Sequence, residues 1–573
     1  MWIQRHDPFG NWLLSTLVAS LPILVLLGLL ASGRASAWRA ALAGLATACG
    51  VAWLVFGMPT RMIAASMAVG VVFALLRIVW LIVAAVFLYD ITVATGQFEV
   101  MKASVARLSA DRRLQAVLVA FCFGAFIEGA AGFGAPVAIS AAFLVGLGFQ
   151  PFEAALLCLI ANTAPVAWGG IGTPILTLSK VTGLDVHALS ATSGRILPIL
   201  SLVIPFWLVR TMTGWRETAA VWFPLSVIGG TFAAVQFFWS NYVGFELVDI
   251  VASVASMVAG VIVIRLWSPR RTWRFERDLE ADQLPVQTSG TAPQTSQSPL
   301  TVRRITRAWM PFALLTVTVL VWGIPAIKPW GTPAVKDWLD QKLSWKPELS
   351  WLHLKIAKGP AVTGHESPKP EDFEKAQVDI VPLSSTGTAV FLAALASGLL
   401  LGLPVPRMGQ LFAGTVTRMI PAIAAILFML ALGFVTKYSG MDAVLGLAFT
   451  RTGPHLYPIF GTLLGWLGVA LTGSDTSSNV LFGNLQKITA EKLGLNPILM
   501  ASANTTGGVM GKMIDAQSIV VAAAATGEGG REGELLRAVF WHSIVLALLV
   551  GAIVWVYAEI LPGVVALAPT SPG

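Results

Sequence analysis

A carboxylate and three glycines lie together in a stretch that is otherwise apolar enough to sit in lipid. The stretch FIEGAAGFGAP (126–136) places Glu128 directly before Gly129, with Gly132 and Gly134 close behind. A charge at the centre of a membrane helix costs roughly 2.5 to 3.5 kcal/mol, and hydrocarbon does not tolerate unpaired backbone groups. We therefore expect this stretch to line a protein-enclosed cavity, a feature typical of transport sites.

Three more polar interruptions occur in apolar surroundings, at 162–174, 472–479 and 504–518. Each is rich in Gly, Ser, Thr, Asn or Pro. Glycine lets the backbone leave helical geometry, and the resulting half-helix N-termini expose N–H groups that suit a small carboxylate. Side chains for a second polar group on that ligand are Asn162, Thr163, Ser474, Thr476, Asn504 and Thr505. The pattern indicates a small polar anion.

Three carboxylates are predicted to lie at membrane depth, namely Glu128, Asp475 and Asp515. Burial favours the neutral form of a carboxyl group, so these side chains could bind and release a proton during a cycle. Glu128 is the first candidate for the proton carrier, and the alternative is a structural pairing with an arginine. Lys512 lies one helical turn before Asp515, so it either neutralises Asp515 or binds the carboxylate of the ligand.

Arg77 and Arg418 interrupt long apolar stretches, and either is a possible anion ligand. An arginine near the end of a span commonly extends to the interface instead, and we favour this interpretation for Arg418. Structural alternatives exist for the other residues too. Small residues at 129–134 also allow close helix packing, and the Ser/Thr/Asn cluster 472–479 also provides hydrogen bonds between helices.

The elements that position these residues are predicted to be membrane helices. Of the 573 residues, 56% are hydrophobic and only 12% charged, with a mean hydropathy of +0.75, far from the composition of a soluble protein. We expect an all-α polytopic membrane protein with about twelve to fourteen crossings, some of them broken. The apolar spans lie near 11–31, 36–57, 137–149, 154–178, 219–240, 246–264, 308–327, 386–403, 456–474 and 538–557.

The net charge of +8 does not indicate nucleic-acid binding, because the arginines lie in short loops beside the spans, where positive charge sets orientation. The three cysteines are isolated in apolar segments, and the six histidines are scattered. Neither a disulfide framework nor a metal site is predicted. We expect no cofactor other than a coupling ion.

Two charged segments orient the middle of the chain. Residues 268–307 carry seven arginines, whereas 328–380 carry eight lysines, eight acids and no arginine. By the positive-inside rule, 268–307 is a cytoplasmic linker, 308–327 a connecting helix and 328–385 an extracytoplasmic loop. The remaining domains are an N-terminal transmembrane half (1–267) and a C-terminal half (386–573).

The two halves show a weak internal repeat. A shift of 342 residues brings Ala161-Asn162-Thr163 onto Ala503-Asn504-Thr505, and a shift of 341 brings Arg77 onto Arg418. The first unit, about 36–210, begins in a span that runs outward, whereas the second begins in a span that runs inward. Two units in opposite directions predict an inverted-repeat transporter with its site near the midplane. A coincidence of two Asn-Thr pairs is the alternative.

Four strings resemble the lactate permease family of bacterial and archaeal inner membranes, in order and in spacing. They are GAFIEGAAGFGAPVAIS (124–140), ANTAPVAWGGIGTPI (161–175), LTGSDTSSNVLF (471–482) and ANTTGGVMGKMIDAQS (503–518). The resemblance implies proton-coupled uptake of lactate or glycolate, and inverted repeats with re-entrant hairpins. Two departures are Asp515-Ala516, where the family is expected to read Ser-Pro, and a charged segment at 328–380 that is longer than expected.

Three alternatives to proton symport stay open at this stage. A sodium-coupled carboxylate carrier is one, because unwound carbonyls beside Ser474, Thr476, Asn504 and Thr505 suit Na⁺. An intramembrane aspartyl protease is another, prompted by Tyr89-Asp90 and Gly473-Ser474-Asp475. We consider it the weaker alternative, since paired aspartates explain neither the repeat nor Glu128. A passive channel is the third.

Overall fold

The structure, a computed structural model, is built from helices, with a single pair of two-residue strands in the described part of the chain. It describes residues 1–31, 35–106, 109, 111–130, 135–267, 271–275, 301–323, 339, 342–343, 345, 347–363, 368–374, 376, 380, 383–528 and 531–565. Gly132, Gly134, most of the predicted linker 268–307 and the first part of the predicted loop 328–385 lie outside these residues.

Seven helical segments of the described chain are long and apolar enough to cross a membrane. They are the continuous run of α3 (Thr60–Phe73), the π-helical turn η1 (Ala74–Val79) and α4 (Trp80–Ala94); the run of α6 (Arg112–Ala116), the π-helical turn η2 (Val117–Phe123) and α7 (Gly124–Ala130); α11 (Val186–Thr213); α13 (Trp222–Tyr242); α14 (Val248–Leu266); α20 (Val405–Ser439); and α26 (Glu532–Glu559).

Shorter apolar helices and one bent pair supplement these spans. The short helices are α1 (Trp12–Ala31), α2 (Ala37–Leu54), α8 (Ala135–Gly146), α19 (Thr386–Leu400) and α22 (Tyr457–Thr472). α16 (Val302–Gly323) overlaps the predicted connecting helix 308–327, of which residues 324–327 lie outside the described chain. The all-α polytopic class is confirmed, and the total of twelve to fourteen crossings stays a prediction.

The first polar interruption is the tip of a helical hairpin. The run α6–η2–α7 is wholly buried inside the protein. α8 returns antiparallel to it, because the Arg112 guanidinium at the start of the hairpin donates a hydrogen bond of 2.6 Å to the carbonyl of Leu147 at its end. Residues 131–134 at the tip lie outside the described chain. Burial of the whole run inside the protein sets it apart from the lipid-facing spans, and its predicted re-entrant character stays a prediction.

A second hairpin is formed by α22 and α23 (Asp475–Leu493). The Tyr457 hydroxyl at the start of α22 donates to Gln486 Oε1 in α23 at 2.8 Å, so the two arms lie side by side. Gly473 at the tip has a φ of +73°, a conformation that glycine adopts without steric cost and that here ends α22. Ser474 follows and caps α23 by accepting a hydrogen bond from the Ser477 N–H at 3.3 Å.

A broken helix follows each hairpin. After the first come α9 (Pro151–Ala161), the 3₁₀ turn η3 (Val166–Trp168) and α10 (Gly169–Thr182), bent by 67°. We predicted one apolar span at 154–178, and the bend falls where its polar residues lie. After the second come α24 (Pro497–Gly511), the 3₁₀ turn η6 (Lys512–Ile514) and α25 (Ala516–Thr526). α10 packs along α23 and α25 packs along α8, so each hairpin contacts the other broken helix.

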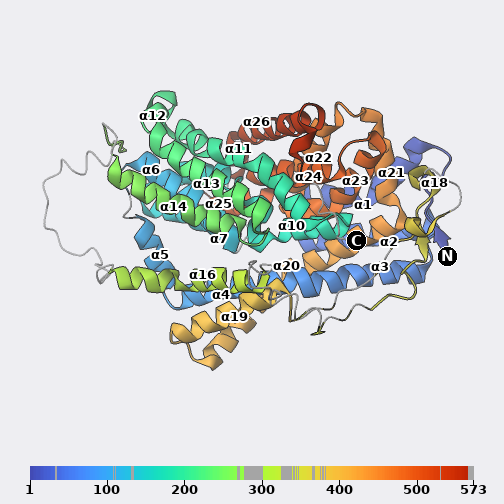
Figure 1. Ribbon diagram of the computed structural model, residues 1–573, viewed down its shortest axis with the longest axis horizontal. Coiled ribbons are helices and arrows are strands. Elements are labelled where there is room, and N and C mark those ends of the chain that lie inside the picture. Colours follow the sequence, from blue (N-terminus) through green and yellow to red (C-terminus); the bar gives the residue numbers. More distant parts are fainter. Residues whose placement is uncertain are drawn as a thin grey trace, which may run out of the picture.

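The two ends of the molecule are built differently. At the end that we call the arginine end, Arg113 binds the Glu217 carboxylate at 2.8 Å and the carbonyl of Arg271 at 3.2 Å. At the opposite end, the loop end, β1 (Trp2–Ile3) pairs in parallel with β2 (Ile356–Ala357). Figure 1 shows the N-terminus and α18 (Pro360–Thr363) at one end of the long axis, and α6 and α12 (Trp215–Ala219) towards the other. The first hairpin opens to the arginine end, and the second opens to the loop end.

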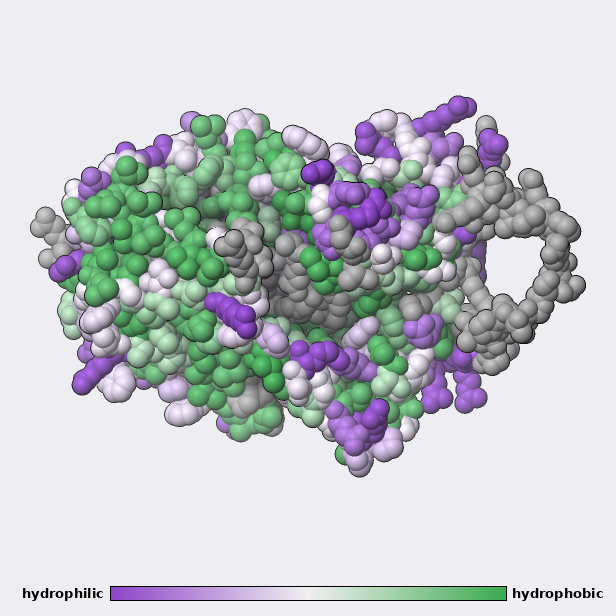
Figure 2. All heavy atoms as spheres, turned by 180° about the vertical axis from the view of Figure 1, so that it is seen from behind, coloured by the Kyte–Doolittle hydropathy of each residue, from purple (hydrophilic) through white to green (hydrophobic). Residues whose placement is uncertain are grey.

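Apolar side chains cover much of the outer surface between these ends (Figure 2). Large exposed examples include Leu24, Trp222, Phe238, Val258 and Leu549. A soluble monomer rarely exposes so large an apolar area, whereas helices that face lipid must do so.

Candidate functional site

Glu128 lies in the interior of the protein, in the last turn of α7. Its side chain is 4% exposed, and Oε2 has no hydrogen-bond partner. The carboxylate packs against the backbone of Gly169 at the start of α10, where a β-carbon would lie 2.7 Å from Glu128 Oε1. Gly169 therefore leaves the space that the carboxylate occupies. The structure gives Glu128 no arginine partner among the described ion pairs.

The bend between α9 and α10 has an unusual backbone. Gly170, Ile171 and Gly172 have φ values of +51°, +58° and +76°. Two glycines suit this left-handed conformation, but the β-branched Ile171 pays a steric cost that the surrounding packing must offset. A β-carbon at Gly172 would also meet the carbonyl of Phe245 in the turn before α14. Strain of this kind is common at binding sites.

Asn162 ends α9 at this bend and lies next to Glu128. It is 3% exposed, and its amide makes no hydrogen bond of standard geometry, with the Glu128 carboxylate as the polar group beside it. A buried amide without such bonds is costly, and such a group commonly awaits a ligand or a water molecule. The neighbouring Thr163 instead donates to the carbonyl of Ile160 at 2.8 Å, which is a local structural role.

The predicted polar residues of the second half form one connected network. Thr505 donates to Asp475 Oδ2 at 2.5 Å, and Asn479 donates to Thr505 Oγ1 at 2.7 Å. Asn504 donates to Asn479 Oδ1 at 2.9 Å, and Asn479 also reaches the carbonyl of Pro174 in α10 at 3.3 Å. The second hairpin is thus joined to the first broken helix. Asp475 Oδ1 remains without a partner.

Lys512 is the cation at the centre of these elements. Its ammonium donates to the carbonyl of Gly473 at the hairpin tip at 2.7 Å and pairs with Asp515 at 3.1 Å. Its charge also acts on Glu128 and on Asp475. One buried ammonium therefore interacts electrostatically with three carboxylates. These come from α7, from α23 and from the break between α24 and α25. We call Glu128, Asn162, Asp475, Asn479, Thr505, Lys512 and Asp515 the central cluster.

Asp515 has a partner on each side. It caps α25 by accepting from the Ser518 N–H at 2.7 Å, and its other oxygen faces Lys512. Lys512 and Asp515 are thus in contact, and the neutralising role of Lys512 stays a prediction. The other prediction, that Lys512 binds the carboxylate of a ligand, is compatible with this geometry because an ammonium has three N–H donors.

A fourth buried carboxylate was not predicted. Asp249, in the first turn of α14, is 1% exposed, and both of its oxygens lack hydrogen-bond partners. It lies near Glu128 and Gln236. A β-carbon at Gly129 would approach the Asp249 β-carbon to 3.0 Å, so Gly129 allows α7 and α14 to touch. Close packing, the structural alternative for these glycines, is what the structure shows for Gly129.

Other predicted residues make contacts outside the central cluster. Ser474 and Thr476 face a small cavity of about 20 Å³ lined by Met429 and Leu430 of α20. Arg418 is 61% exposed and pairs with Asp90 at 2.5 Å, so the structure places it at the α4–α20 contact. Asp90 is thus held by Arg418 and Thr415, whereas Asp475 is held by Thr505. The described residues therefore contain no shared pair of these two aspartates, which the intramembrane protease alternative would need.

The predictions for Arg77, Gly132 and Gly134 concern residues that the structure describes only in part or not at all. The backbone of Arg77 lies in η1, but its side chain is outside the described part of the structure, as are Gly132 and Gly134. Within the described residues, no three His, Cys, Asp or Glu side chains are arranged to share a metal ion.

Comparisons with known proteins place the chain among bacterial permeases. A family model described as L-lactate permease matches residues 15–561. Glycolate permease GlcA of Escherichia coli K12 is 42% identical over 98% of this chain and 99% of that protein. The L-lactate permease of Bacillus subtilis 168 is 43% identical over 96% and 97%. The solved structure of the Neisseria gonorrhoeae efflux pump MtrF covers 88% of this chain and 84% of its own, with 12% identity and a TM-score of 0.43. That score is too low to establish a shared fold.

Proposed function

The chain belongs to the L-lactate permease family, and on this basis we propose that it is a secondary active transporter that takes up lactate and related 2-hydroxymonocarboxylates, such as glycolate, together with protons. Bacterial permease relatives and apolar spans make it a multi-pass protein of the bacterial inner membrane. The substrate class follows from relatives named for lactate and glycolate. Proton coupling is our own inference and rests on the central cluster.

The observation that carries the proposal is the charge balance around Lys512. Glu128, Asp475 and Asp515 share one ammonium, and Asp249 lies beside Glu128 with no cation among its described neighbours. An uncompensated buried charge costs several kcal/mol, so four ionised carboxylates around one lysine are not a stable arrangement. We infer that carboxyl groups of this cluster hold protons. An incoming carboxylate adds one more negative charge, and a proton bound with it restores the balance.

Residue roles follow from the contacts. Lys512 has one N–H donor beyond its bonds to Gly473 and Asp515, and this donor suits the carboxylate of a substrate. The amide of Asn162 suits the 2-hydroxyl group or the second carboxylate oxygen. Glu128 is the proton carrier, with Asp249 as its neighbour. Asp475, held by Thr505, fixes the hairpin tip against α24.

The arrangement of the hairpins supports alternating access. The first hairpin opens to the arginine end and brings Glu128 of α7 to the central cluster, whereas the second opens to the loop end and brings its tip, Gly473, to Lys512. In an inverted pair of this kind, rocking of one unit against the other exposes one fixed site to each side in turn. We propose that the arginine end is cytoplasmic, in agreement with the positive-inside rule.

The proposal is tested by reconstitution. Purified protein in liposomes receives labelled L-lactate, with an inward proton gradient, no sodium and the membrane potential clamped at zero. We expect accumulation above equilibrium that unlabelled glycolate reduces and a protonophore abolishes. Uptake only after addition of sodium would support the sodium-coupled alternative, and equilibration without accumulation would indicate a channel or uniporter.

A second experiment assigns the proton carrier. Glu128→Gln fixes this side chain in a neutral form of the same size, so we expect it to lose proton-driven accumulation while it retains exchange of external for internal lactate. Exchange needs no net release of the proton. Asp249→Asn tests the neighbour in the same two assays. If Glu128→Gln accumulates lactate like the wild type, the proton is carried elsewhere.

A further inference from the structure

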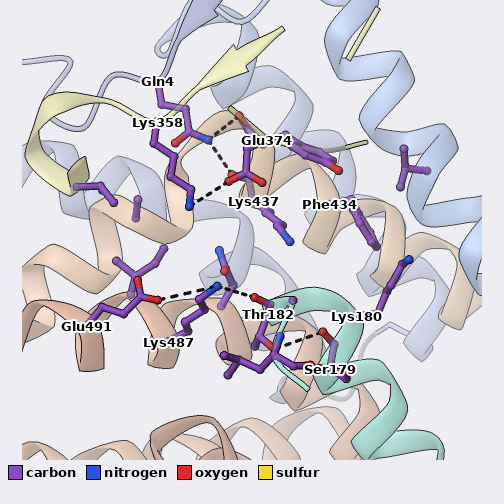
Figure 3. A pocket seen from close by; sticks show the side chains of 18 of the residues that line it. Gln4, Ser179, Lys180, Thr182, Lys358, Glu374, Phe434, Lys437, Lys487 and Glu491 are labelled. Carbon is purple, nitrogen blue, oxygen red and sulfur yellow. Dashed lines mark hydrogen bonds and ion pairs between the residues drawn. The ribbon is translucent and has the colours of Figure 1, made fainter. Parts of the chain in front are cut away.

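A cavity lies at the loop end, separate from the central cluster. Its volume is about 600 Å³, and its walls come from α3, α10, α20, α23 and the extracytoplasmic segment around Lys358 and Glu374 (Figure 3). Apolar side chains such as Phe73 and Phe434 form part of the wall. This volume is in the range of pockets that take drug-sized ligands, so a three-carbon acid would fill only a fraction of it.

Basic residues dominate the charged part of the wall. Among the described residues that line the cavity, four lysines outnumber two glutamates: Lys180, Lys358, Lys437, Lys487, Glu374 and Glu491. The ion pairs within this set are loose, at 3.9 Å for Lys358 with Glu374 and 3.9 Å for Lys487 with Glu491. The cavity therefore keeps a positive potential that favours anions.

Two of the lysines also bind the end of α10. Lys437 donates to the carbonyl of Val181 at 2.7 Å, and Lys487 donates to the carbonyl of Thr182 at 2.8 Å. Each ammonium has three N–H groups, so these bonds leave donors for a ligand or water. These two lysines have a structural role as helix caps in addition to their charge, and they are unsuitable as sole probes of anion binding.

The same helices connect the cavity to the central cluster. α23 carries Lys487 at the cavity and Asp475 at the cluster, and their separation of twelve positions corresponds to about 18 Å at 1.5 Å per residue. α10 runs beside it, as the bond from Asn479 to the carbonyl of Pro174 shows. The two helices thus extend side by side from the cavity to the region of Lys512.

We propose that this cavity is a recruiting site for small monocarboxylate anions, which it collects at the loop end before they pass to the central cluster. The inference rests on the proposed function, since it names the entry site for the same substrates. The large volume and the loose ion pairs make binding here weak and without stereochemical preference. Its effect is to raise the local anion concentration, which lowers the apparent KM and depends on ionic strength.

The test compares initial rates of L-lactate uptake into right-side-out membrane vesicles at low and high ionic strength. The double variant Lys180→Gln/Lys358→Gln removes two charges but leaves the caps Lys437 and Lys487 in place. At low ionic strength we expect its KM to rise severalfold with little change in kcat. At high ionic strength, where charges more than about 3 Å apart are screened, the KM values of wild type and variant should converge.

Two controls separate charge from structure. Lys180→Arg/Lys358→Arg keeps both charges and should keep the wild-type KM. Lys355→Gln removes an exposed positive charge from the same segment outside the cavity wall and should leave both parameters unchanged. A KM for the double variant equal to that of the wild type at low ionic strength would overturn the proposal. A KM rise that persists at high ionic strength would do so as well.

A binding measurement keeps this inference separate from the proposed transport function. Saturation-transfer NMR with L-lactate detects weak binding to the purified protein without any gradient. A signal that is smaller in the double variant than in Lys355→Gln at low salt supports the recruiting site. This holds even if wild-type vesicles fail to accumulate lactate, a result that would contradict the proposed transport function. Equal signals in both variants count against the recruiting site alone.

Discussion

At the scale of single residues, the central cluster depends on hydrogen bonds that hold carboxylates around one lysine. Asp475 accepts from Thr505 and faces Lys512, while its other oxygen has no partner. A hydrogen bond to a charged group contributes about 1.5 to 3 kcal/mol, and loss of one partner leaves a buried group unsatisfied. The hydroxyl of Thr505 is thus as important to the arrangement as the charges themselves.

Thr505→Val removes this hydroxyl at nearly constant volume. We expect the rate of lactate uptake to fall by roughly tenfold or more, because the loss of about 1.5 to 3 kcal/mol frees the Asp475 carboxylate. Thr505→Ser keeps the donor and should retain most of the activity. Uptake rates in vesicles, normalised to the amount of folded protein, measure both. Equal rates for the Val and Ser variants would show that the bond to Asp475 does not matter.

Sequence reasoning found most of the cluster but not all of it. Glu128, Asp475 and Asp515 were predictable because each carboxylate interrupts an apolar run and has glycines or hydroxyl residues beside it. Asp249 has no such signal. It lies near the start of the predicted span 246–264, where an acid is usually solvated, and only the contact of α14 with Gly129 buries it. That contact joins residues 120 positions apart, which periodicity cannot reveal.

At the scale of elements, the bend between α9 and α10 is the feature that positions Glu128. Polar residues at 162–174 predicted an interruption, and its direction depends on three consecutive left-handed residues that include Ile171. A β-branched residue is unfavourable in that conformation, so local propensity gives no hint of it. Tertiary packing, including the Phe245 carbonyl against Gly172, fixes the bend.

Gly169→Ala tests the contact between this bend and α7. The added methyl would lie 2.7 Å from Glu128 Oε1, which forces the carboxylate or the bend to shift. We expect severe loss of uptake with the protein still inserted in the membrane. Gly146→Ala is the matched control, because its β-carbon meets no atom within 4 Å and alanine favours the helix. Wild-type uptake by Gly169→Ala would mean that Glu128 has room to move.

The N-terminal segment offers a prediction on pH. Burial, with the charge of Lys492 as a lesser cause, lowers the pKa of His6 to about 4. The ordinary value is near 6.5, so the detached segment binds a proton more tightly than the docked one. The free energy of docking of the N-terminal segment therefore has its full value above pH 6.5 and declines as the pH falls towards 4.

Hydrogen exchange of the β1 amides measures this docking. The N–H groups of Trp2 and Gln4 bind the carbonyls of Lys355 and Ala357, both at 2.9 Å. We expect their protection to fall roughly tenfold or more between pH 6.5 and 4, after correction for intrinsic exchange. His6→Phe keeps a ring that does not titrate and should remove the dependence. A wild-type protection factor that is constant over this range would show that His6 does not control docking.

At the scale of the whole molecule, two oppositely opening hairpins around one cation suggest how charge crosses the membrane. Each is followed by a broken helix, and α10 and α25 cross to the other hairpin. The weak repeat of Asn-Thr pairs predicted two units, but Asn162 ends α9 whereas Asn504 lies inside α24. The inverted relationship therefore stays a prediction that rests on the opposite openings of the hairpins.

With one proton per monocarboxylate, the loaded cluster gains no net charge, so the membrane potential should not drive uptake. Each pH unit across the membrane then contributes about 1.36 kcal/mol, or a tenfold ratio of lactate at equilibrium. In liposomes with a potassium gradient and valinomycin, we expect accumulation to follow the imposed pH difference and to be insensitive to an inside-negative potential. Accumulation that rises by about 2.3 kcal/mol per 100 mV would require a second coupled cation, because one extra elementary charge would then cross with each substrate. In that case Asp249→Asn would be the first variant to make. Asp249 is buried, has no described cation partner and is the remaining carboxylate beside Glu128.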